Sequence, residues 1–179
     1  LMKREITPAE GAAGTTIENF TYDELSRIET AADDDTGLRY QFDRASRLDT
    51  EKQGTRQEWV QQAGKLIDYT YNKLSNLTNL AYPNTRLIER QYDQLNRMNL
   101  IKEGTFTIAD MKHIGRSYRL LSKQYGNGDL ITYLYDQGRR LESLEARNKN
   151  TGSLINGYRY GYNKINLKTY EQRMHNAGK

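Results

Sequence analysis

Phe20-Thr21-Tyr22-Asp23-Glu24-Leu25-Ser26-Arg27-Ile28 is the stretch that decides the fold, because its pattern returns along the chain. The pattern is an aromatic residue, any residue, a second aromatic residue, an acid, three turn residues, an arginine and an aliphatic residue. The second aromatic residue falls at positions 22, 42, 71, 92, 135 and 162. A recurrence of this kind, mostly every 20 to 30 residues, indicates a repeat array.

The copies assign a structural signature rather than a catalytic one. Its residues are Tyr22, Asp23, Arg27, Phe42, Asp43, Arg47, Tyr71, Tyr92, Asp93, Arg97, Tyr135, Asp136, Arg140 and Tyr162. The long step between Tyr92 and Tyr135 predicts a degraded seventh copy, with Ile114 in the place of the aromatic residue and Arg119-Leu120 after it. The copy at Tyr162 is read as one residue short, ending in Asn166-Leu167.

Each copy predicts an antiparallel β-hairpin. Phe20 and Tyr22 alternate with Thr21, and this period of two is typical of a strand. Residues 23–26 predict a turn in which the Asp23 side chain accepts a hydrogen bond from the amide two residues on. Residues 27–30 then predict the returning strand, so the sequence as a whole indicates an all-β protein.

Stacked hairpins stabilise one another. We expect aromatic residues at equal offsets to lie beside one another, with strands about 4.8 Å apart. We expect the arginines to lie over ring faces or to pair with the turn aspartates. A single hairpin is marginally stable, so the array is the stable unit.

The segments between the hairpins are also typical of turns, with two exceptions. Gly126-Asn127-Gly128 and Asn156-Gly157 predict turns because asparagine and glycine tolerate positive φ. Residues 57–66 are compatible with either a longer hairpin that turns at residues 62–64 or a short helical turn. Residues 108–114 are the other place where the strand prediction is open.

Composition excludes several classes of function. The 27 basic and 23 acidic residues give a net charge of +4 without a basic run of five or six residues, so no nucleic-acid partner is indicated. Cysteine is absent, which excludes disulfides and thiolate metal sites. No apolar run approaches the roughly 20 residues of a membrane span. We predict a lead-in over residues 1–14 and about seven repeats in one array over 15–179, cut from a larger protein.

The repeated pattern resembles the YD repeat of rearrangement-hotspot (RHS) proteins, and Tyr125-Gly126-Asn127-Gly128 before Tyr135-Asp136 is also typical of that family. The resemblance implies tandem antiparallel hairpins that form a curved, spiralling sheet, part of a hollow shell. It implies a bacterial secreted or cell-surface location in the parent protein. It also implies, as partners, further repeats of the parent or a second copy at open strand edges, and an encapsulated toxin domain. Asn72 and Asn163 depart from the pattern by replacing the aspartate.

No constellation for catalysis, a cofactor or a metal stands out. His113 and His175 are far apart and are interpreted as surface residues, although each alone could ligate a metal. Asp33-Asp34-Asp35 lacks the spacing of a calcium loop and is interpreted as a solvated turn. We therefore expect a non-enzymatic structural segment. The alternative is a carbohydrate-binding or adhesion module that uses exposed tyrosine and arginine side chains.

Overall fold

The computed structural model describes residues 2–7, 10, 14–60 and 64–175, and this part of the chain is almost entirely β-structure. Its single helix, α1 (Arg56–Val60), has only five residues. The strands are β1 (Met2–Glu5), β2 (Ile17–Tyr22), β3 (Ile28–Ala32), β4 (Thr36–Phe42), β5 (Leu48–Thr55), β6 (Lys65–Tyr71), β7 (Leu77–Ala81), β8 (Leu87–Tyr92), β9 (Met98–Glu103), β10 (Phe106–His113), β11 (Leu120–Tyr125), β12 (Leu130–Tyr135), β13 (Leu141–Arg147), β14 (Leu154–Tyr162) and β15 (Lys168–His175).

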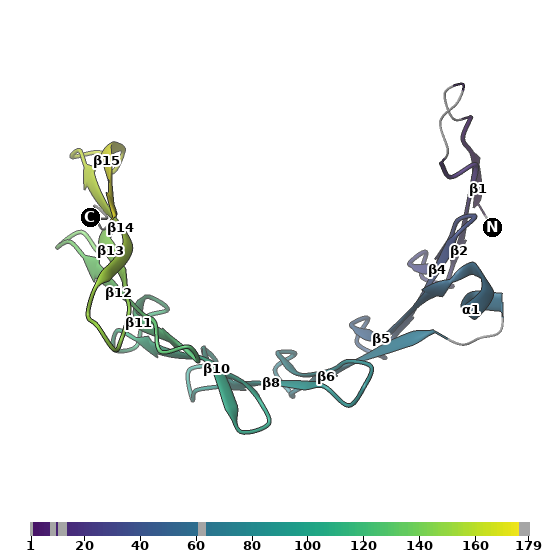
Figure 1. Cartoon of the computed structure of the whole chain (residues 1–179), viewed down its shortest axis with the longest axis horizontal. Helices are drawn as coiled ribbons and strands as arrows, with labels where there is room; N and C mark the ends of the chain where they lie inside the picture. Colours follow the sequence, from purple (N-terminus) through teal and green to yellow (C-terminus); the bar gives the residue numbers. More distant parts are fainter. Residues whose placement is uncertain (1, 8–9, 11–13, 61–63, 176–179) are drawn as a thin grey trace. The chain divides into compact units, whose positions relative to one another are not determined.

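The strands form one open antiparallel sheet in which spatial order follows chain order from β1 to β15 (Figure 1). Every strand therefore pairs with its neighbours in sequence, as expected for tandem hairpins. The chain divides into two compact units, Leu1–Ile88 and Glu89–Lys179. The predicted all-β fold of tandem antiparallel hairpins is confirmed.

The two faces of the sheet differ because side chains alternate along each strand. In β4, Leu38, Tyr40 and Phe42 are half-buried, whereas Arg39 and Gln41 between them are exposed. The same alternation places Tyr133 and Tyr135 of β12 on one face. We call this side, with its row of aromatic residues, the aromatic face.

The core is thin because the sheet is a single layer. The apolar side chains that are buried among the described residues are Leu80, Ala109, Met111 and Ala146. The aromatic residues of the signature are only partly covered, by neighbours on the adjoining strands. Stability must therefore come from contacts between successive hairpins, as in other repeat proteins.

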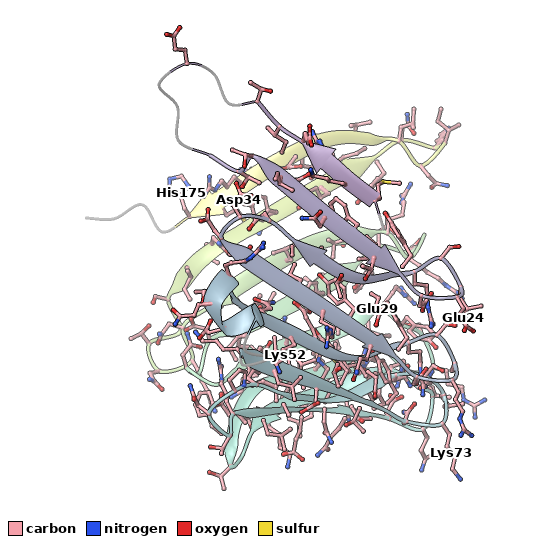
Figure 2. The ribbon with its side chains drawn as sticks, turned by 90° about the vertical axis from the view of Figure 1, so that its right-hand side faces the viewer. Glu24, Glu29, Asp34, Lys52, Lys73 and His175 are labelled. Carbon is pink, nitrogen blue, oxygen red and sulfur yellow. The ribbon has the colours of Figure 1, made fainter. Side chains whose placement is uncertain are left out.

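The alternation of strand direction sorts the turns onto two edges. The turns that follow the even-numbered strands β2 to β14 all lie at one edge, which we call the signature edge. The opposite edge carries the remaining connections and is called the connector edge. In the first unit, Glu24 and Lys73 lie at the signature edge and Asp34 at the connector edge (Figure 2).

Several local predictions are decided by the structure. Residues 56–60 form α1, beside β4 and β5, so the helical alternative for this region is correct (Figure 1). The predicted turn at residues 62–64 falls largely outside the described residues. Residues 108–113 belong to strand β10, and the predicted lead-in contains strand β1, which pairs with β2.

The predicted turn at Asn156-Gly157 is wrong, because both residues lie within strand β14. Gly157 is buried, and a Cβ atom there would lie 2.9 Å from Met174 Cε and 3.1 Å from the Leu144 carbonyl oxygen. The glycine therefore permits close approach of neighbouring strands rather than a reversal of the chain.

Candidate functional site

The turn at Asp23 shows how the signature folds locally. The Asp23 amide donates to the Arg27 carbonyl at 2.9 Å, and the Ser26 amide donates to the Asp23 carbonyl at 3.0 Å. The Asp23 carboxylate accepts hydrogen bonds from the amides of Leu25 at 2.9 Å and Arg27 at 3.0 Å. Ser26 adopts a φ of 61°, which lets the chain re-enter the ladder one residue out of register.

The same hydrogen bonds recur in other turns of the signature edge. The amide or carboxylate oxygen at the first turn position accepts from the amide two residues on in the turns that begin at Asp43, Asn72, Asp93 and Asn163. This bond was expected from the sequence. It explains why asparagine replaces aspartate without loss of the turn, since the Oδ1 atom is present in both side chains.

Each signature arginine is first bound to the aspartate of its own turn. The Nε atoms of Arg27, Arg47, Arg97 and Arg140 donate to the aspartate Oδ2 at 2.6–2.7 Å, and their Nη2 atoms lie 2.5–2.7 Å from it. Hydrogen bonds from Arg97 hold the pKa of Asp93 at about 2, below the usual value for an aspartate. The Asp23 pKa is lowered for the same reason, the hydrogen bond from the Arg27 side chain being the main cause.

The same arginines also reach the ring of the next hairpin. Arg27 Cζ lies 4.3 Å from the centroid of the Phe42 ring, and Arg47 Cζ lies 4.5 Å from that of Tyr71. In the second unit, Arg140 lies over Tyr162 at 4.8 Å. These cation–π contacts join one repeat to the following repeat.

Hydrogen bonds to the next turn complete the link. Arg47 Nη1 donates to Ser75 Oγ at 3.1 Å, and Arg97 Nη1 donates to the Gly115 carbonyl at 2.8 Å. Arg140 Nη1 donates to the Asn163 carbonyl at 3.1 Å. One guanidinium thus closes its own turn, covers a ring and binds the following turn, all with the direction of the chain.

The expected row of adjacent aromatic residues is wrong. The signature rings close the even-numbered strands, with one odd-numbered strand between each pair, so equal offsets lie two strand spacings apart. The arginine that begins the returning strand occupies the space between two rings. Within each unit the row is therefore arginine and ring in alternation, and the tyrosine hydroxyls of Tyr71 and Tyr162 donate to the carbonyls of Leu48 and Leu141 at 2.9 Å.

Two degraded copies are corrected by the hydrogen bonds. His113, not Ile114, stands in the aromatic place, because it pairs with Leu120 as Tyr22 pairs with Ile28. His113 is half-buried, and burial followed by the charge of Arg97 lowers its pKa. In the last copy the Asn163 amide donates to the Leu167 carbonyl, so this turn has full length and Leu167 stands in the arginine place.

The sequence gave a signal for both corrections that we misread. Ile114 to Arg119 contains one residue more than the other turns, and the Ile114 amide takes the place of the aspartate amide. Counting the copy from the aromatic residue rather than from the turn produced the shift of one residue. The remaining signature rings stand where expected, at the ends of β2, β4, β6, β8, β12 and β14.

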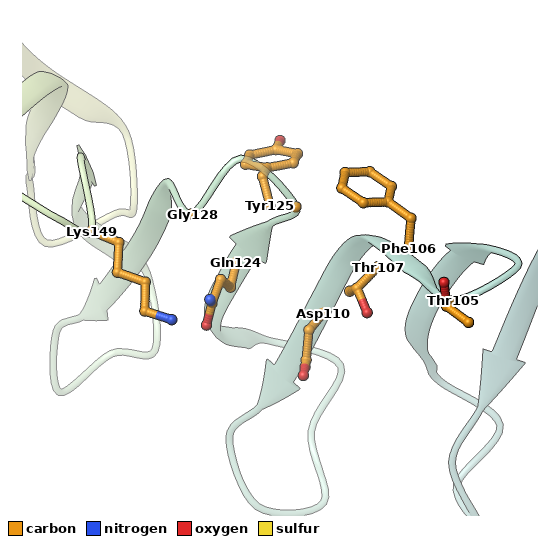
Figure 3. Close-up of a pocket in the computed structure, with 9 residues that line it drawn as sticks. Thr105, Phe106, Thr107, Asp110, Gln124, Tyr125, Gly128 and Lys149 are labelled. Atoms are coloured by element: carbon orange, nitrogen blue, oxygen red, sulfur yellow. The ribbon is translucent and has the colours of Figure 1, made fainter.

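A second candidate site lies at the connector edge of the second unit. A hollow of about 370 Å³ is bordered by the rings of Phe106 and Tyr125 and by the side chains of Asp110, Gln124 and Lys149 (Figure 3). Asp110 and Gln124 are direct partners across β10 and β11. Sequence reasoning missed this hollow because its residues come from three separate hairpins.

The described residues show no grouping of three or more histidine, cysteine, aspartate or glutamate side chains suited to a metal ion. Asp33 accepts hydrogen bonds from the amides of Asp35 at 2.9 Å and Thr36 at 2.6 Å. Asp34 accepts from the amide and hydroxyl of Thr16 at 2.7 and 2.6 Å. These two carboxylates therefore close the connection between β3 and β4. No helix in this part of the chain is long and apolar enough to cross a membrane.

Comparison with solved structures finds the same arrangement of hairpins in Tc toxin assemblies. The crystal structure of TcdB2–TccC3 matches with a TM-score of 0.67 and 12% identity over 96% of this chain. TcdB2–TccC3–Cdc42 matches with a TM-score of 0.66, 13% identity and 96% coverage. The Tc holotoxin pore of Photorhabdus luminescens matches with a TM-score of 0.66, 12% identity and 96% coverage.

The chain spans about a tenth of the length of each of these solved chains, with 10% covered in all three. No model of a protein family and no curated sequence matches it. At 12–13% identity the likeness concerns the fold. TccC3 is an RHS-repeat protein, so the resemblance read from the sequence is confirmed at the level of structure: the chain has the fold of a segment of an RHS-type hairpin array.

Proposed function

We propose that the chain is a non-enzymatic wall segment of an RHS-type shell, whose role is to enclose another polypeptide, such as a toxin domain. The observation that carries the proposal is the arginine link. Arg47 binds its own turn through Asp43 and the next hairpin through Tyr71 and Ser75. A device of this kind extends a single-layer wall indefinitely without a central core.

The fold of the Tc toxin components supports a structural role, and the described part of the chain offers no grouping of catalytic side chains. The signature carboxylates are held at low pKa by arginine, which suits an ion pair rather than a general acid. By the same reasoning we propose that the parent protein is exported to the bacterial cell surface or beyond. There the wall would join further repeats through its outer strands.

Limited proteolysis of the complete gene product tests enclosure. We expect a polypeptide outside residues 1–179 to be protected in the native protein and to become cleavable when Arg47→Met and Arg140→Met break two links. The Arg44→Met variant is a matched control, because Arg44 is an exposed arginine of the same turn as Arg47. Equal cleavage of native and doubly substituted protein, at sites throughout the chain, refutes enclosure.

Carbohydrate binding is a second candidate, but not through the signature residues. The side chains of the paired arginines are only 10–29% exposed, since they lie against aspartates and rings. The hollow between Phe106 and Tyr125 is the better place. Aromatic rings beside a carboxylate and an amide suit the C–H face and hydroxyls of a pyranose ring, because the ring offers an apolar face and the polar groups fix orientation.

Screening the chain on a glycan array tests this candidate. We expect saturable binding to be lost in a Phe106→Ser variant and kept in a Phe42→Leu variant, whose ring belongs to the arginine link. Absence of any bound glycan, or equal loss in both variants, refutes the hollow as a sugar site.

A further inference from the structure

The turns of the signature edge carry exposed apolar side chains that the fold does not use. Leu95 and Ile165, each two residues after the start of its turn, are 42% and 72% exposed. Their amides donate to Asp93 and Asn163 at 2.9 and 3.0 Å, so the backbone is fixed while the side chain projects outward. Tyr118 in the intervening turn is 72% exposed.

This exposure recurs at one position, which distinguishes it from ordinary surface scatter. In the first unit, Leu25 and Leu74 stand at the same place in their turns, and both are 67% exposed. Turn tips normally carry polar residues or glycine. Single exposed apolar residues need no explanation, but a repeated row of them indicates a surface that is used. We call these side chains the apolar tips.

Positive charge accompanies the apolar tips of the second unit. Arg116, Arg139 and Lys164 lie in the same turns and are exposed. No acidic side chain in those turns remains to neutralise them, because Asp93 and Asp136 are already bound by Arg97 and Arg140. The signature edge of this unit is therefore basic.

The connector edge of the same unit is balanced by contrast. Glu103 and Asp129 accompany Arg147 and Lys149 there, so acids and bases are equal in number. The basic charge is thus confined to the edge that also carries the apolar tips. A partner for this edge must be acidic and must accept apolar side chains.

We propose that the signature edge of the second unit binds the surface of a bilayer that contains anionic phospholipids. Arg116, Arg139 and Lys164 would attract the headgroup phosphates. Leu95, Tyr118 and Ile165 would enter the interfacial region, where a tyrosine keeps its hydroxyl hydrated.

The spacing of the turns favours a bilayer over a folded protein. Successive turns are two strand spacings apart, about 9.5 Å. A folded partner must offer a separate hollow for each isolated tip in register with this spacing. A fluid layer of headgroups accepts each tip independently, and it presents many phosphates to the cations at once.

Sedimentation with vesicles tests the proposal, using the whole 179-residue chain. Vesicles are prepared from phosphatidylcholine alone and from equal parts of phosphatidylcholine and phosphatidylglycerol. We expect binding to the anionic vesicles only, weakened as salt rises. The triple substitution Arg116→Gln, Arg139→Gln and Lys164→Gln should weaken it about a hundredfold, since each basic residue near the surface contributes about fivefold.

A second triple variant, Lys112→Gln, Lys149→Gln and Arg159→Gln, removes the same charge from exposed positions elsewhere in this unit and should bind nearly as well as the native chain. The pair Tyr118→Ser and Ile165→Ser should weaken binding several-fold at constant charge. Circular dichroism establishes that each variant is folded.

Three results overturn the proposal. One is the absence of sedimentation with anionic vesicles, and another is an equal loss in the two triple variants. The third is full competition by soluble polyglutamate together with unchanged binding of the Tyr118→Ser, Ile165→Ser variant, which assigns the edge to an acidic polypeptide instead.

Discussion

Replacement of Arg47 by methionine isolates the link between hairpins. Methionine keeps the apolar stem of the side chain over the sheet but removes the guanidinium. Two contacts to the next hairpin are lost, the cation–π contact with Tyr71 at 4.5 Å and the hydrogen bond to Ser75 at 3.1 Å. Each contributes about 1 kcal/mol at a partly exposed site, so the local stability should fall by about 2 kcal/mol.

Hydrogen exchange followed by mass spectrometry is the suitable assay, because a repeat array need not unfold in a single step. Amides of β5 and β6 should exchange about thirtyfold faster, which corresponds to the loss of about 2 kcal/mol. Amides of β12 and β13 belong to the other unit and serve as an internal reference.

The matched control is Arg44→Met, which changes the charge of the same turn equally. A double-mutant cycle that combines Arg47→Met with Tyr71→Leu should give a coupling of about 1 kcal/mol. The reasoning is refuted if exchange in β5 and β6 responds alike to Arg47→Met and Arg44→Met. A coupling near zero would show that ring and guanidinium do not act together.

Three further predictions follow from the same contacts. Because the pKa of Asp93 is about 2 in the folded chain and about 3.9 when unfolded, its stabilising effect is present above pH 4 and lost as pH falls toward 2; acid titration should show a smaller loss in Asp93→Asn, and an unchanged titration contradicts this. Gly126→Ala should destabilise by about 2 kcal/mol in thermal unfolding, since its Cβ would lie 2.1 Å from the Thr107 carbonyl oxygen, whereas Gly14→Ala meets nothing within 4 Å and should be neutral. The outer edge of β15 should promote self-association at high concentration, and light scattering that shows only monomer would count against it.

Much of the local structure was readable from sequence. The alternation around Phe20 and Tyr22 predicted strands, and the aspartate at position 23 predicted the turn, because both depend on residues within one hairpin. The fold class followed from repetition alone, since a tandem hairpin array needs only nearest-neighbour pairing. The segment at residues 57–66 stayed open because short apolar runs do not distinguish a helix from a strand.

Tertiary structure decided what lies between hairpins. Equal offsets suggested that rings would touch one another, but the returning strand separates them and places Arg27 against Phe42. Gly157 was taken for a turn residue, whereas Met174 and Leu144 on adjoining strands require its missing side chain. The hollow at Phe106 and Tyr125 likewise assembles from three hairpins. Sequence determines how each hairpin is made because those interactions are local; which side chains meet across hairpins depends on strand order and register, which exist only in the folded sheet.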